Sequence, residues 1–201
     1  MRTLVRNLFK LRVVLLVTPL LLSGCAGIPL STMVRMARFD PKTLLSLDPA
    51  EFLVAINTDA RVQSIASAPT TFELKITPRD PALWSPLERS VAMQAIAVSS
   101  DLGLAPAPVG RRWLVFGFDA GAGAELRAIQ QHFRSLQQRE SGGGSIGLGI
   151  GQQWLAQNYS TLRDQEVETW LRLDAHEGFF KLWHGHIRDL ERVKSNATTQ
   201  R

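Results

Sequence analysis

Three short stretches of the chain have the hydrophobic pattern of β-strands. Residues 72–77 alternate strictly between apolar and polar side chains, as in a strand with one face buried and one face in water. Residues 52–57 are short, apolar and rich in residues that favour strands. Residues 112–118 are apolar at almost every position, which predicts a central strand that is covered on both faces.

Four further segments complete the predicted β-structure. Residues 144–151 alternate apolar residues with glycine, which predicts a strand whose missing side chains admit a close neighbour, such as the backbone of a helix. Residues 167–173 and 179–184 flank a short turn and predict a β-hairpin. Residues 87–98 fit a strand by alternation and a helix by three- and four-residue steps. The strand is favoured because strands are predicted on both sides of it.

The clearest helix is predicted over residues 119–139. Apolar residues recur at steps of three and four along it, at Leu126, Ile129, Phe133 and Leu136. Asp119 is the candidate N-cap, because its carboxylate can accept hydrogen bonds from the first backbone N–H groups of the helix. Polar residues, Gln130 among them, are expected to fill the opposite face. One apolar stripe predicts a helix that packs on a sheet.

Together these elements predict an α+β fold. We expect a mainly antiparallel sheet or sandwich of about six to seven strands, with the helix over residues 119–139 packed on it. The sequence contains no internal repeat and no sign of a second domain. Residues 49–193 are therefore predicted to form a single globular domain, and residues 194–201 a flexible tail.

The first 25 residues follow a different pattern. Residues 13–24 form an apolar run, and the leader before it carries four basic residues and no acidic one. A membrane-spanning helix needs about 20 apolar residues. Extending the run towards the N-terminus would place Arg6, Lys10 and Arg12 in lipid, at roughly 2.5–3.5 kcal/mol each. The pattern therefore favours a cleaved export signal over a membrane-spanning anchor.

The apolar run ends in Leu22-Ser23-Gly24-Cys25, which resembles the lipobox of bacterial lipoproteins. The resemblance implies cleavage before Cys25, a diacylglycerol on its sulfur and acylation of the new N-terminus. The next residue is Ala26 rather than Asp, and the same resemblance then implies passage to the outer membrane, with the protein on the periplasmic face. The resemblance covers the first 26 residues only, and the motifs of the mature domain resemble no family.

The lipobox divides the N-terminal part of the chain into a signal peptide over residues 1–24 and a lipid-anchored tether over residues 25–48. Within the tether, residues 33–39 mix apolar and basic side chains. Such a segment fits a lipid surface, where its arginines meet headgroups. It also fits a segment packed across the domain's own core, and this second interpretation is favoured.

The net charge does not indicate a nucleic-acid partner. The chain has 23 Lys and Arg against 18 Asp and Glu, a formal net charge of +5. Four of the basic residues and none of the acidic ones precede Cys25, which leaves 19 against 18, scattered along the rest of the chain. Nucleic-acid binding needs a clustered basic face, so this class is excluded. Cys25 is the only cysteine, so the domain has no disulfide and no cysteine-pair zinc site.

Two motifs overlap in the glycine-rich segment. Residues 142–147 read G-x-G-x-x-G, the dinucleotide-binding pattern, and a G-x-S-x-G pattern is centred on Ser145. Asp174, followed by His184 or His186, would complete a hydrolase triad in chain order. Both motifs need a strand before them and a helix after them, whereas here a helix is predicted before and a strand after. The sequence therefore assigns no catalytic residue and no nucleotide cofactor.

The histidines suggest a metal site only weakly. His184 and His186 would point to the same side of an extended strand. His176 lies eight to ten residues away along the chain, too far to join them at roughly 3.3 Å per residue. A metal site usually needs three or four ligands in fixed geometry. We therefore predict no metal ligand, and surface or turn positions for these side chains.

Five tryptophans invite comparison with a ligand groove: Trp84, Trp113, Trp154, Trp170 and Trp183. Tryptophans buried in a core, with the indole N–H hydrogen-bonded, are the commoner case, and at least three are expected there. An exposed pair, Trp170 and Trp183 on the predicted hairpin, is a candidate anchor for a partner protein.

The favoured function is a non-enzymatic lipoprotein at the periplasmic face of the outer membrane. It would be attached to the membrane through Cys25, and its domain would serve as an interaction or assembly module for a protein partner in the cell envelope. A carrier or receptor for a small apolar ligand such as a lipid is the alternative, and it requires a pocket lined by Trp and Phe. An esterase-type hydrolase that uses Ser145 is the third hypothesis.

Overall fold

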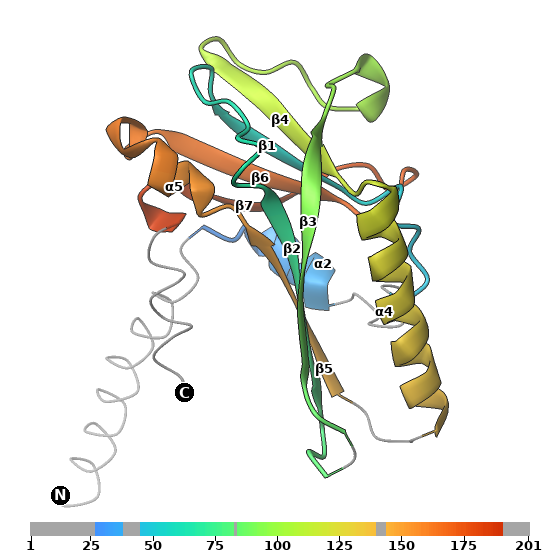
Figure 1. Ribbon diagram of the computed structural model, residues 1–201. Helices are drawn as coiled ribbons and strands as arrows, with labels where there is room; N and C mark the ends of the chain where they lie inside the picture. Colours follow the sequence, from blue (N-terminus) through green and yellow to red (C-terminus); the bar gives the residue numbers. More distant parts are fainter. Residues whose placement is uncertain (1–26, 38–44, 83, 140–143, 191–201) are drawn as a thin grey trace, which may run out of the picture.

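The computed structural model describes residues 27–37, 45–82, 84–139 and 144–190. In this part of the chain, seven strands form one antiparallel sheet that curls into a half-barrel, with one long helix packed on it (Figure 1). The predicted α+β class, with a mainly antiparallel sheet and a single long helix, is confirmed. The strands belong to one curled sheet, so the sandwich alternative does not apply.

The strand order is β5-β2-β3-β4-β1-β6-β7, and every neighbouring pair is antiparallel. Strands β2, β3 and β5 extend away from the others as an arm of the sheet (Figure 1). The strands are β1 (Leu53–Asp59), β2 (Thr70–Pro78), β3 (Leu87–Ile96), β4 (Arg111–Gly117), β5 (Gly144–Gly151), β6 (Glu166–Arg172) and β7 (Phe180–His186).

The long helix α4 begins where its N-cap was predicted. The Asp119 carboxylate Oδ1 accepts a hydrogen bond from the backbone N–H of Ala122 at 2.7 Å, and its carbonyl accepts one from Gly123 at 2.8 Å. The helices and helical turns of the described residues are α2 (Leu30–Ala37), η2 (Ser100–Leu102), α4 (Ala120–Arg139), α5 (Trp154–Asn158) and η3 (Ser160–Leu162).

The main core lies between the concave face of the sheet and α4. Strand β2 shows the expected alternation, with Phe72, Leu74 and Ile76 buried and the residues between them more exposed. Helix α4 contributes its apolar stripe to the same core through Leu126, Ile129 and Phe133. The side chain of Leu136 lies outside the described part of the structure. The stripe therefore holds the helix on the sheet, as its spacing predicts.

Gln130 was assigned to the wrong face of this helix. Its side chain is 5% exposed, and its Nε2 donates a hydrogen bond to the carbonyl of Leu47 at 3.0 Å. The segment that carries Leu45 and Leu47 packs beside α4 and presents a backbone carbonyl there. An amide that satisfies this carbonyl replaces the apolar side chain that a buried position would otherwise take.

The two central strands, β4 and β1, are covered on both faces, as predicted for β4. Leu114 and Phe116 of β4 point into the main core. Val115 points to the convex face, where it forms a second cluster with Leu53 and Ala55. The loop between β3 and β4 covers this second cluster with Leu102 and Leu104, among other side chains.

Two strand assignments are settled by the sheet. Residues 87–96 form strand β3, so the favoured alternative for this segment is confirmed. Strand β5 is also present, but its close neighbour is β2 and not a helix. A Cβ added at Gly144 would lie 2.5 Å from the carbonyl oxygen of Thr77, and one at Gly151 would lie 2.1 Å from Thr71 Oγ1. The glycines therefore allow close strand pairing at this edge.

Candidate functional site

The structure does not support a nucleophile elbow at Ser145. Ser145 is the second residue of β5, opposite Thr77 of β2, and the strand continues after it to Gly151. None of the described non-glycine residues has a positive φ, so the sharp turn that exposes such a nucleophile is not formed at Ser145. Of the G-x-G-x-x-G motif, Gly144 and Gly147 lie in this strand, and Gly142 lies outside the described residues.

The predicted triad partners are not brought to Ser145. His184 and His186 lie on β7, and five strands separate β7 from β5 in the sheet order. Asp174 lies in the β6–β7 turn, where its Oδ1 accepts a hydrogen bond from the backbone N–H of His176 at 2.6 Å. These residues are turn and strand positions at separate places in the sheet.

His184 and His186 do share one side of β7, as their spacing predicts. They lie opposite Glu168 and Glu166 of β6. Among the described residues, no group of three or more His, Cys, Asp or Glu side chains is arranged to hold a metal ion.

His186 contacts Asp189, three residues further along the chain. Its backbone N–H donates to Asp189 Oδ2 at 2.9 Å, and its Nδ1 lies 3.4 Å from the same oxygen. The backbone hydrogen bond, against some opposition from burial, holds the pKa of the Asp189 carboxyl below its ordinary value. This contact fixes the chain where it leaves β7.

The tryptophans divide between the two faces of the sheet. Trp154 is buried, and its indole N–H donates to Thr70 Oγ1 at 3.1 Å. Trp84 and Trp183 are partly buried against the main core. Trp113 and Trp170 instead pack on the second cluster, that of Leu53, Ala55 and Val115. At least three tryptophans were expected in the core; one is buried there and two more pack against it, partly exposed.

The predicted pair of Trp170 and Trp183 is wrong. An irregularity in the β6–β7 register follows Thr169, so that Thr169 lies opposite Trp183 and Trp170 lies opposite Lys181. Thr169 is buried on the concave side, and Trp183 follows it inward while Trp170 points outward. The partner of Trp170 is Trp113 on β4, with ring centroids 6.0 Å apart at 81°.

Trp113, Glu168, Trp170 and Lys181 form a half-buried group that we call the convex-face cluster. Lys181 Nζ lies 2.6 Å from Glu168 Oε1 and 5.2 Å from the centroid of the Trp170 ring. The Trp170 indole N–H donates to Glu168 Oε2 at 3.2 Å. Burial raises the pKa of Glu168, but the hydrogen bonds from Lys181 and Trp170 outweigh it, so the pKa lies below its ordinary value. The polar groups of Glu168, Trp170 and Lys181 thus satisfy one another, and the Trp113 indole N–H donates to the carbonyl of Ala105 at 2.8 Å.

Residues 27–37, which we call the N-terminal segment, cover the free edge of β7. The carbonyl of Gly27 accepts a hydrogen bond from the backbone N–H of His184 at 2.7 Å. The Thr32 hydroxyl donates to the carbonyl of Lys181. Arg35 pairs with Glu177 and lies over the ring of Phe180, 4.2 Å from its centroid. The segment is therefore docked along the edge strand rather than on the main core, where we had expected it.

Helix α2 in this segment has its polar and apolar faces reversed relative to an ordinary surface helix. Thr32 is 3% exposed, and together with Arg35 it faces the domain. Leu30 and Val34, four residues apart and thus on one face of a helix, point away and are 74% and 46% exposed. Ile28, just before the helix, is 42% exposed. Three large apolar side chains therefore form an outward apolar face on the N-terminal segment.

No family model matches this chain, and no curated protein or solved structure matches it. The candidate site is therefore defined by its own geometry, as the outward apolar face of Ile28, Leu30 and Val34. No helix among the described residues is both long and apolar enough to cross a membrane. Cys25 and Ala26, which carry the predicted anchor, lie outside the described residues.

Proposed function

We propose that the chain is a lipoprotein anchored at Cys25 to the periplasmic face of the outer membrane, whose domain is a non-enzymatic interaction and assembly module. The observation that carries this proposal is the outward apolar face of the N-terminal segment. In a protein that met only water, the polar side of α2 would face outward and its apolar side would face the domain.

The position of this face relative to Cys25 supports a membrane as its partner. Only Ala26 separates Cys25 from Gly27, and a chain spans at most about 3.5 Å per residue. A lipid on Cys25 therefore brings Ile28, Leu30 and Val34 to the bilayer surface. Burying such a side chain fully is worth about 1.5–3 kcal/mol. These side chains supply the second contact that holds a lipidated protein close to the membrane.

The sheet supports an interaction module rather than a carrier or an enzyme. The concave face, where a small apolar ligand would be held in a half-barrel, is packed with the side chains of the main core from β1, β2, β4 and α4. Ser145 lies on β5, whereas its proposed triad partners lie on β7 and in the β6–β7 turn. The domain instead offers a broad folded surface held at a fixed place on the membrane.

The anchor is tested first. Intact-mass spectrometry of the membrane-extracted protein should show a mature chain that begins at Cys25 and carries three acyl chains. Cys25→Ala should remove the modification and leave the precursor uncleaved. Ala26→Asp should keep the lipid but move the protein to the inner-membrane fraction. A free Cys25 thiol in the mature wild-type protein would refute the anchor.

The contact of the N-terminal segment with lipid is tested in the lipidated full chain. A polarity-sensitive fluorophore on Leu30→Cys or Val34→Cys should emit as in an apolar medium and be quenched by a lipid-borne quencher in vesicles of phosphatidylethanolamine and phosphatidylglycerol. The matched control is Val109→Cys, which is fully exposed in the loop before β4. Equal quenching at all three positions would contradict the proposed orientation.

A further inference from the structure

The two edges of the sheet are treated differently. Strand β7 is covered by the N-terminal segment, whereas β5 at the other end pairs with β2 on one side and with no other strand of the described chain. The free side of an edge strand carries unpaired N–H and C=O groups and is a template for a further strand. Nothing on β5 acts against such pairing, because it contains no proline and no charged residue.

The sequence of β5 is the same in both directions around its centre. Residues 146–150 read Ile-Gly-Leu-Gly-Ile. If two copies pair antiparallel with Leu148 opposite Leu148, then Ile146 meets Ile150 and Gly147 meets Gly149. In an interface with two-fold symmetry, residue i of one copy meets j of the other and j meets i, so within residues 146–150 apolar residues meet apolar residues and glycines meet glycines.

This pairing would bury apolar surface that the single chain leaves partly open. Ile146, Leu148 and Ile150 lie on the concave side and pack against the main core, but each is only half-buried. Directly opposed residues of antiparallel strands have their side chains on the same face. The three side chains of each copy would therefore cover those of the other and continue the core across the joined edge.

On the convex side of the sheet, the glycines of β5 leave room between oppositely charged residues of the two copies. Glu73 of β2 lies over Gly149 and Gly151, and its Oε2 would be 3.1 Å from a Cβ at Gly149. Lys75 lies opposite Gly147. Since Gly149 of one copy would face Gly147 of the other, Glu73 of one copy would face Lys75 of the other across two residues without side chains.

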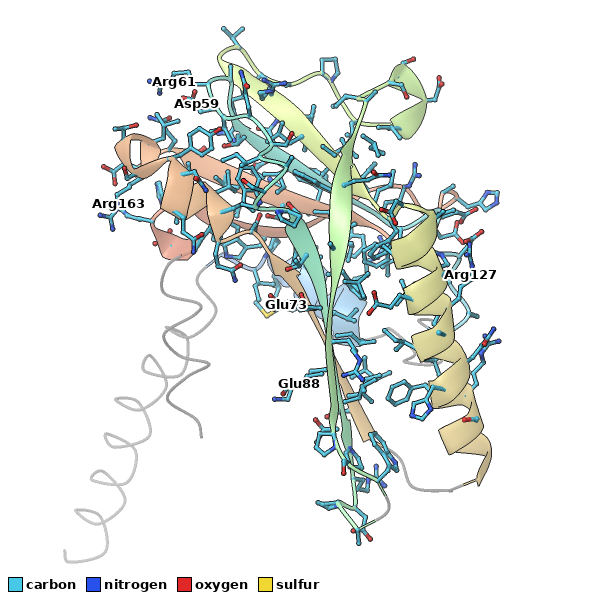
Figure 2. The ribbon with its side chains drawn as sticks, viewed as in Figure 1. Asp59, Arg61, Glu73, Glu88, Arg127 and Arg163 are labelled. Carbon is cyan, nitrogen blue, oxygen red and sulfur yellow. The ribbon has the colours of Figure 1, made fainter. Side chains whose placement is uncertain are left out.

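The two-fold axis creates this arrangement twice in each dimer. The backbones of the two β2 strands would be three strand spacings, roughly 14 Å, apart, and the long side chains of Glu73 and Lys75 would extend towards each other over the glycines. Lys75 already lies 2.6 Å from Glu88 Oε1 of β3 on the exposed face, so the charges would join into a network. Glu73 and Glu88 both lie on the arm formed by β2, β3 and β5 (Figure 2).

We propose that β5 pairs antiparallel with β5 of a second copy, joining two seven-stranded sheets into one across a two-fold axis at Leu148. The inference goes beyond the proposed function. The pairing depends on the sheet alone and not on lipidation. Failure of the proposed pairing would therefore leave the proposed function intact, and failure of the proposed function would leave the pairing intact.

Disulfide trapping in the full chain tests the register. Leu148→Cys places two thiols directly opposite, at a Cα separation of about 4.5–5.5 Å, which a disulfide bridges. Mild oxidation should give a covalent dimer on a non-reducing gel. Ser145→Cys lies on the same strand but meets Gly151, which leaves its two thiols roughly 20 Å apart at about 3.3 Å per residue. It should give no dimer. The wild-type protein is the control for any disulfide-linked dimer that forms through Cys25.

A pair of charge variants tests the interface without disturbing the core. Gly147 is exposed, and a Cβ there would lie 3.7 Å from the Lys75 Cβ, an ordinary contact. Gly147→Glu would sit beside Lys75 in its own chain but face Glu73 of the second copy. Gly147→Lys reverses both relations. The first should raise the dissociation constant of the dimer about tenfold over the second, because the contact occurs twice in each dimer.

Two results would overturn the proposal. One is the absence of a Leu148→Cys dimer beyond the wild-type level, which would also be the outcome if a strand of another protein occupied this edge. The other is equal trapping of Leu148→Cys and Ser145→Cys, which would show contact without register.

Discussion

Gly27 joins the N-terminal segment to the sheet and has a conformation that suits only glycine. Its φ is 109°, and a Cβ there would lie 2.4 Å from Trp183 Nε1 and 2.5 Å from the carbonyl oxygen of His184. Both atoms belong to the covered edge of β7. A side chain at this position would therefore collide with the surface on which the segment docks.

Replacing Gly27 with alanine should detach the N-terminal segment while the domain stays folded. We expect trypsin to cleave the Gly27→Ala variant at Arg35 at least about tenfold faster, because loss of docking frees Arg35 from Glu177 and Phe180. The control is Gly103→Ala, where φ is 74° but no atom lies within 4 Å of the added Cβ. Similar cleavage of both variants would show that the faster cleavage comes from general destabilisation by a strained backbone, and not from lost contact between the segment and β7.

A second prediction at the residue scale concerns Asp59 at the end of β1 (Figure 2). Its carboxylate accepts hydrogen bonds from the Arg61 side chain at 2.8 Å and from the Arg61 backbone N–H at 2.9 Å. The side-chain bond contributes most, and together these bonds lower the pKa of Asp59 from 3.8 to about 2. Because ionisation is easier in the folded state, the pair stabilises the fold above the unfolded pKa.

This stabilisation should be lost as the pH falls through the folded pKa. We expect Asp59→Asn to be less stable than the wild type at pH 7, and the difference in unfolding free energy to shrink between about pH 5 and pH 2. Urea unfolding at a series of pH values measures it. Arg61→Gln should show a pH dependence of the same sign but smaller size, since it removes the side-chain hydrogen bonds and keeps the backbone N–H donor. A difference that does not change with pH would rule out this carboxylate as its source.

Several residue positions were beyond prediction from the sequence, for a physical reason. The burial of Gln130 depends on the Leu47 carbonyl, and the pairing of Trp170 with Trp113 depends on the register irregularity after Thr169. Both are set by segments far away in the chain. The burial of a tryptophan such as Trp154 is easier to anticipate from the sequence, since tryptophans are more often buried than exposed.

At the scale of elements, regular patterns were reliable. The alternation of β2 and the apolar stripe of α4 each predicted the correct element and the correct buried face. Helix α2 was missed because its pattern was interpreted against the wrong partner. Residues 33–39 were interpreted as a segment packed across the domain's core, whereas Leu30 and Val34 of the helix face away from the domain. Strand β3 was ambiguous until its pairing with β2 and β4 showed which period it follows.

The N-cap of α4 gives a prediction at this scale. Asp119→Ala removes the acceptor for the Ala122 N–H and should lower the unfolding free energy by about 1 kcal/mol. The expected effect is moderate because α4 is also held by its buried stripe. Gln131→Ala, an exposed position on the same helix, should change stability by less than about 0.5 kcal/mol. Equal losses in the two variants would mean that Asp119 does not cap the helix.

At the scale of the whole molecule, the order of the strands determines which strands are shielded from solvent. Strands β1 and β4 are buried on both faces and β7 is covered by the N-terminal segment, whereas β5 is an edge that no further strand of the described residues covers. The sequence predicted the strands but not their order, because β1 pairs with β4 and β6, which lie 52–64 and 111–119 residues further along the chain.

Hydrogen exchange should follow this order. We expect the amides of β1 and β4 to exchange slowest and those of β5 fastest among the strands when the protein is dilute. Raising the protein concentration should slow exchange in β5 and leave β1 unchanged, since only the edge gains partners when copies pair. Exchange in β5 that does not depend on concentration would mean that its edge stays unpaired.

The docking of Gly27 on β7 also limits where this protein can act. With the proposed lipid on Cys25, only Ala26 separates the lipidated residue from Gly27, so the domain would stay beside the membrane and could not cross the periplasm to reach a partner. Its encounters are confined to the plane of one membrane, where diffusion in two dimensions keeps the copies at a high effective concentration. Such confinement favours neighbours in the same leaflet, and above all another copy of the same chain.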